Sequence, residues 1–134
     1  MDASTYVLSR VLPAPAAEFR RCTEACAGAE PRFALAELNA LLAGFSTGEL
    51  RTAVAEFPAG GLSAFLRNYI AAMVEHACAR RAVTVPGRVW VVKPLSEPVF
   101  GSELQSVRLH LLTQSPPAFR CRNIFIDSSV GERV

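Results

Sequence analysis

The chain has 134 residues, 51% of them hydrophobic, and a formal net charge of +2. This length suits one domain, and the hydrophobic content is enough for a buried core and too high for a disordered protein. No uncharged apolar stretch approaches the ~18 residues that a membrane-spanning helix needs, so we expect no membrane partner. The first residues lack the basic and apolar regions of a secretory signal, which predicts a cytoplasmic protein.

The charge is unevenly distributed. Residues 1–77 hold six basic and eight acidic side chains, whereas residues 78–134 hold eight basic and four acidic ones. This basic surplus indicates a binding face for an acidic partner, and a protein fits it as well as nucleic acid does. We expect a protein partner, with nucleic acid as a secondary partner. The strong preference for arginine over lysine, together with abundant alanine, indicates a bacterial source of high GC content.

Helical spacing of apolar residues predicts a mainly α, single-domain bundle of about five helices. The predicted helices, in chain order, are 16–27, 34–43, 47–57, 62–81 and 103–113. Ser46 and Glu49 form a capping-box pattern before the third helix. The fourth helix is the longest and carries an apolar stripe, so we expect it to be the central packing helix.

Five of the nine prolines lie after residue 81, where they interrupt regular elements. We expect residues 84–100 and 115–134 to wrap the bundle as extended, proline-rich C-terminal segments. The whole chain, 1–134, is then one domain: an irregular arm (1–14), a helical part (15–81) and a tail of mixed extended and helical structure (82–134).

No catalytic, cofactor or metal site is predicted. Cys22 and Cys26 share one helix face, but His76 and Cys78 are two residues apart on a helix and point in different directions, which does not suit zinc. We expect all the thiols, Cys121 included, to be reduced. No histidine lies in a triad-like motif and no glycine-rich phosphate loop occurs, so a small enzyme of unknown type is the least favoured alternative.

A helix-turn-helix at about 36–57 is the main alternative, and it would make the protein a DNA-binding transcriptional regulator. Ala40, Gly44 and Leu50 have the small, glycine and apolar spacing of that motif. The would-be recognition helix offers Arg51 and Thr52 to a groove but also acidic side chains. Sequence readers usually bring several basic or amide side chains, so a short helical hairpin in the core is the better interpretation.

Aromatic and arginine side chains in the tail are the best candidates for binding a partner protein. In an extended chain Arg120 and Arg122 would share one face. Guanidinium groups beside aromatic rings match the composition of protein-interface hot spots. The predicted partner-binding residues are Trp90, Phe100, Phe119, Arg120, Arg122, Asn123 and Phe125.

Several tail motifs together resemble a known group of proteins. In chain order, they are Pro86 followed by Trp90, the step Glu97-Pro98-Val99-Phe100, the pair Ser115-Pro116, and Phe119-Arg120-Cys121-Arg122-Asn123-Ile124-Phe125-Ile126-Asp127. Over residues 84–134 the chain resembles small bacterial proteins encoded beside stand-alone nucleotidyltransferases, with which they form toxin–antitoxin pairs. The resemblance implies a cytoplasmic, antitoxin-like protein without catalytic residues, which neutralises a nucleotidyltransferase toxin by binding it.

Overall fold

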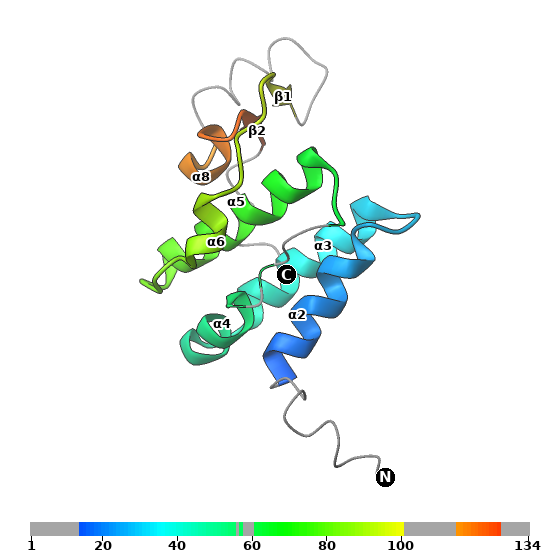
Figure 1. The fold of residues 1–134 in the computed structure, drawn as a ribbon. Coiled ribbons are helices and arrows are strands. Elements are labelled where there is room, and N and C mark those ends of the chain that lie inside the picture. The colour runs from blue at the N-terminus through cyan, green and yellow to red at the C-terminus, as the bar shows by residue number, and fades with distance from the viewer. Residues whose placement is uncertain (1–13, 56, 58–60, 101–114, 127–134) are drawn as a thin grey trace.

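The computed structural model describes residues 14–55, 57, 61–100 and 115–126 (Figure 1). The elements are α2 (Ala14–Ala25), α3 (Pro31–Gly44), α4 (Thr47–Val54), α5 (Ala64–Arg80), α6 (Gly87–Trp90), β1 (Val99–Phe100), α8 (Pro117–Arg120) and β2 (Ile124–Phe125). The mainly α fold class is confirmed, and the four longer helices lie close to their predicted ranges. The predicted helix 103–113 and most of the predicted arm lie outside the described residues.

Helix α2 packs against both α3 and α4, and the three helices form the N-terminal layer (Figure 1). Phe19 of α2, Leu38 of α3 and Leu50 of α4 are fully buried between them. The predicted capping box is confirmed: the Glu49 amide donates to Ser46 Oγ at 3.2 Å, and the Ser46 amide donates to Glu49 Oε1 at 2.9 Å. These two bonds satisfy amide groups that the start of a helix leaves free and fix the turn between α3 and α4.

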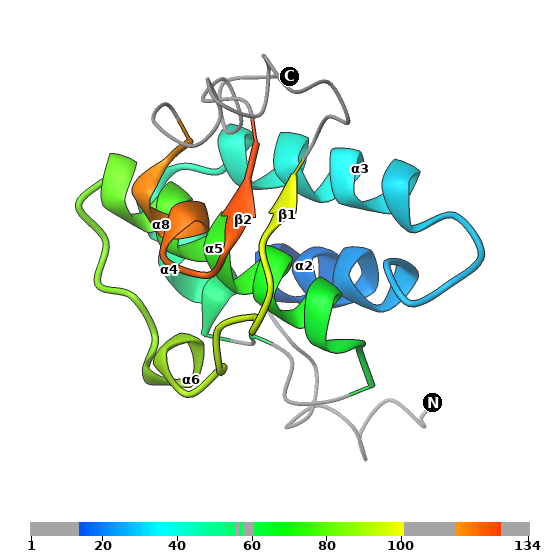
Figure 2. The same cartoon turned by 90° about the horizontal axis from the view of Figure 1, so that it is seen from above.

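Helix α5 is the central element, as predicted. It contacts α3 and α4 on one side and α6 and α8 on the other, and Figure 2 shows α8 and the strands lying over it. The expected one-sided stripe is wrong, because buried residues surround the helix: Asn68, Ala71 and Val74 are as buried as Ile70, whereas Leu66 is only half-buried. A helix that is covered on opposite sides needs apolar or satisfied side chains on both of them.

The prediction that the tail is extended is wrong at two places. Single-turn helices α6 and α8 begin directly after Pro86 and Pro116, and Pro117 occupies the first turn of α8. A proline at the start of a helix lacks an amide that would remain unbonded there anyway, and its φ angle suits a helix. The prolines therefore initiate these turns. Within the segment 115–134 that was expected to be extended, Ile124 and Phe125 form a short strand and pair in parallel with Val99 and Phe100.

Arg81 connects the end of α5 to the N-terminal layer. Its guanidinium donates to the carbonyl oxygens of Leu42, Ala43 and Phe45 at the C-terminal end of α3. Those carbonyls have no partners inside their own helix, and a cation at this end also suits the helix dipole. Among the helices of the described residues, none is long and apolar enough to span a membrane.

Candidate functional site

The predicted pairing of Arg120 and Arg122 on one face is wrong. Arg120 ends α8 and is exposed, whereas Arg122 follows in a turn and is only 5% exposed. The prediction assumed extended chain, in which alternate residues share a face, but the backbone is helical here and then reverses at Asn123, whose φ is +67°. The two guanidinium groups therefore have different environments and different roles.

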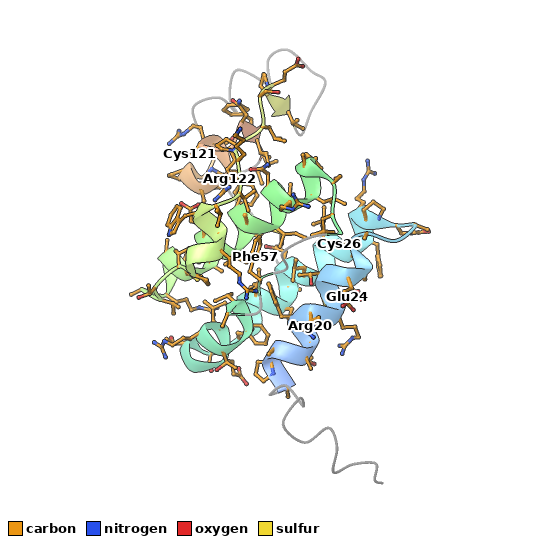
Figure 3. The ribbon with its side chains drawn as sticks, in the orientation of Figure 1. Arg20, Glu24, Cys26, Phe57, Cys121 and Arg122 are labelled. Carbon is orange, nitrogen blue, oxygen red and sulfur yellow. The ribbon has the colours of Figure 1, made fainter. Side chains whose placement is uncertain are left out.

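Arg122 fastens the tail to the helices beneath it (Figure 3). Its Nη2 donates to Val89 O at 3.1 Å and lies 3.5 Å from Glu75 Oε1, and its Nη1 lies 3.3 Å from Asn68 Oδ1 and 3.4 Å from Val92 O. One buried side chain thus links α5 and the α6 segment to the turn after α8. A buried cation needs such compensation, so Arg122 is a structural residue and is not available to a partner.

The aromatic residues of the tail divide into two groups. Phe119 is fully buried, with its ring edge-on to Tyr69 at 5.2 Å, and Phe125 is 7% exposed. Asn123 is half-buried, and its amide donates to Leu95 O at 2.7 Å. These three predicted partner-binding residues belong to the packing of the tail. Phe100 is described only by its backbone in β1.

Trp90 differs from them, since 60% of it is exposed on α6. The next residue, Val91, is 77% exposed. Between buried Val89 and half-buried Val92, these two side chains form an apolar projection, which we call the α6 surface. Large exposed aromatic side chains are common anchors of protein interfaces.

A cavity of about 380 Å³ lies beside the α6 surface. Its lining residues are Phe57, Ala64, Arg67, Asn68, Arg88, Val91, Val92 and Lys93. Three of them are cationic and none is acidic, and we call this the basic cavity. The basic cavity was not predicted from the sequence because Arg67, Arg88 and Lys93 come from separate segments, and only the basic surplus after residue 77 indicated part of it.

The geometry of α3 and α4 adds little support to the helix-turn-helix interpretation. Two residues, Phe45 and Ser46, connect α3 to α4, and α4 ends at Val54. The exposed side chains along α4 include a single basic one, Arg51. The DNA-binding alternative stays a prediction, with few groups to contact phosphates or base edges.

The thiols have the character of core residues. Cys26 and Cys78 are fully buried, and burial raises the pKa of each from the usual 9.0 to about 11. Burial also raises the pKa of Cys22, which is half-buried, whereas Cys121 is exposed. Protonated thiols are poor metal ligands and poor nucleophiles. Within the described part of the chain, no group of three or more potential ligands comes together.

Comparison with protein-family models, with curated proteins and with solved structures finds no match to this chain.

Proposed function

We propose that this protein is an antitoxin-like regulator that binds a partner protein through the α6 surface. The observation that carries the proposal is the exposure of Trp90 and Val91 side by side on a short, firmly held segment. A tryptophan that packs into a partner can contribute a large share of the binding free energy.

Hydrogen bonds from α5 and from the turn after α8 fix the backbone around the α6 surface. Val89 is fully buried, and its carbonyl oxygen accepts a hydrogen bond from Arg122, which also contacts Val92 O. Asn68 of α5 donates to Lys93 O at 2.8 Å. A segment fixed in this way presents its apolar side chains with little loss of conformational entropy on binding.

The surroundings of the α6 surface favour an acidic partner. Arg88 and Lys93 flank it, and both are exposed. Basic groups around an apolar anchor steer association with a negatively charged surface. The α6 surface falls within residues 84–134, the part of the chain that resembles nucleotidyltransferase antitoxins. We therefore propose a bacterial, cytoplasmic protein whose partner is a nucleotidyltransferase toxin encoded beside it.

The test is binding to the nucleotidyltransferase encoded next to this chain's own gene, measured by calorimetry with purified proteins. Trp90→Ala should weaken binding about 30-fold or more, which corresponds to a loss of at least ~2 kcal/mol. Phe33→Ala is the matched control, since it removes another aromatic side chain that is largely exposed, at 64%, but lies on α3.

Both variants should melt within a few degrees of the parent, because both side chains are exposed. The Phe33→Ala control should bind as the parent does. Absence of a complex between the two parent proteins would refute the proposed partner. Equal affinity of Trp90→Ala and the parent would refute the α6 surface as the interface.

A further inference from the structure

The basic cavity lies where the first turns of α5 meet α6 and the segment that follows it. Arg67 and Ala64 come from α5, Arg88 from α6, and Lys93 from the chain after α6. Phe57, which precedes α5, closes another side and lies close to the region where α4, α5 and α6 meet (Figure 3). Three positive charges thus converge on one hollow from separate elements.

Among the described residues, these cations have no acidic partners. Arg67 Nη2 donates to Leu62 O at 2.9 Å, and Arg88 Nη1 donates to Phe57 O at 3.3 Å. Both acceptors are neutral backbone oxygens. Across the described ranges, no carboxylate forms a salt bridge with Arg67, Arg88 or Lys93.

One further donor at the cavity is unsatisfied. The Nε atom of Arg67 is buried and has no hydrogen-bond partner among the described residues. A buried donor without a partner costs free energy, so the protein itself compensates the Arg67 guanidinium only in part.

The neighbouring Arg122 provides a contrast. It is buried, and it has Glu75 within 3.5 Å as a counter-charge. Asn68, although it lines the cavity, is fully used: its amide donates to Ala64 O and Lys93 O, and its oxygen faces Arg122. Arg122 thus has a carboxylate and several acceptors as compensation, although its Nε atom is also buried without a partner, whereas no carboxylate among the described residues pairs with the cations of the cavity lining.

We propose that the basic cavity binds a phosphorylated small molecule. Arg67, Arg88 and Lys93 would hold the phosphate, because guanidinium and ammonium groups form charge-assisted hydrogen bonds with its oxygens. Three cations suit the two or more negative charges of a phosphate monoester or diphosphate better than the single charge of a carboxylate. The positive end of the α5 dipole, at Ala64, adds to the attraction.

The organic part of such a ligand would lie against Val91 and Val92, which form the apolar side of the cavity. A volume of about 380 Å³ falls within the range of small-molecule sites. The site goes beyond the proposed partner binding. It is tested on the chain alone, so either proposal can fail without the other.

The experiment is isothermal titration of the full chain with inorganic phosphate, pyrophosphate, AMP, adenosine and citrate at low salt. Pyrophosphate and AMP should bind, and adenosine should not. Tighter binding of AMP than of inorganic phosphate would identify an organic phosphate as the ligand class, whereas equal binding would restrict the site to inorganic phosphates and overturn the small-molecule assignment. Failure of both pyrophosphate and AMP to bind at millimolar concentration, or tighter binding of citrate than of pyrophosphate, would also overturn it.

Variants locate the site. Arg88→Gln and Lys93→Gln should each weaken pyrophosphate binding about tenfold, since each removes a charge-assisted hydrogen bond. Arg51→Gln is the matched control, because it removes the same charge from an exposed position on α4. It should change the affinity less than twofold. An equal loss in Arg51→Gln would show attraction to overall charge rather than a site, and unchanged affinity in both cavity variants would refute the location.

Discussion

Arg122 shows what a single residue contributes to this fold and why its role was hidden in the sequence. Arg120 and Arg122 are the same residue type two positions apart, and the sequence predicted the same role for both. The difference comes from acceptors far away along the chain, since Asn68 and Glu75 are separated from Arg122 by 54 and 47 positions. No local pattern reports such contacts.

Arg122→Ala should lower the free energy of unfolding by about 3 kcal/mol or more. The substitution leaves Glu75 without its counter-charge and removes donors from Asn68 Oδ1 and two backbone carbonyls. Urea unfolding followed by circular dichroism measures the loss. Arg120→Ala, at the exposed neighbouring position, should cost less than ~1 kcal/mol. Equal losses in the two variants would contradict the structural role of Arg122.

Trp90, unlike Arg122, is largely exposed to solvent. It was predicted as a partner-binding residue together with Phe119 and Phe125, and only it is largely exposed. All three are large aromatic residues near prolines, so composition could not separate them. Burial of Phe119 follows from its contact with Tyr69 of α5, which depends on how α8 packs in three dimensions.

At the scale of elements, the sequence predicted the longer helices but not the single-turn helices. Helices α2 to α5 contain eight to 17 residues, long enough for apolar spacing and capping residues to identify them. Helices α6 and α8 have four residues each, which is too short for any repeat. Their prolines were interpreted as breakers, but the same residue type also starts helices, and the sequence offered no means of choosing.

The orientation of helix α5 can be tested by alanine substitutions at a buried and a half-buried position. Ile70→Ala should destabilise the protein by about 2–5 kcal/mol, because Ile70 is fully buried and its truncation leaves a cavity. Leu66→Ala on the same helix is the control and should cost clearly less, since Leu66 is only half-buried. Thermal and urea unfolding of the two variants provide the comparison. A larger loss for Leu66→Ala would mean that α5 is rotated from its position in this structure.

At the scale of the whole molecule, the sequence predicted the class of fold but not the assembly of the tail on α5. The basic cavity illustrates the reason. Its cations stand at positions 67, 88 and 93 and meet only because α6 packs against α5. The α6 surface was predicted in part, through Trp90, whereas its support by Arg122 and Asn68 depends on tertiary contacts that periodicity and charge counts do not contain.

The thiols allow a test of whether the molecule opens as one unit, as a single domain should. Cys26 follows α2 in the N-terminal layer, and Cys78 lies near the end of α5. Both are fully buried and, with pKa values raised to about 11, stay protonated at pH 8. They should therefore react with a thiol reagent only when the fold opens.

Mass spectrometry after timed alkylation at pH 8 distinguishes the four cysteines. Cys121 is exposed and should be modified first, whereas Cys26 and Cys78 should be modified much more slowly and at equal rates that rise together with urea. Equal rates follow if one cooperative unfolding step exposes both thiols. Chelators should leave all the rates unchanged if no metal holds the thiols. Faster modification of Cys26 than of Cys78 would show that the N-terminal layer opens separately, and the chain would then consist of two cooperative units that share α5 as their boundary.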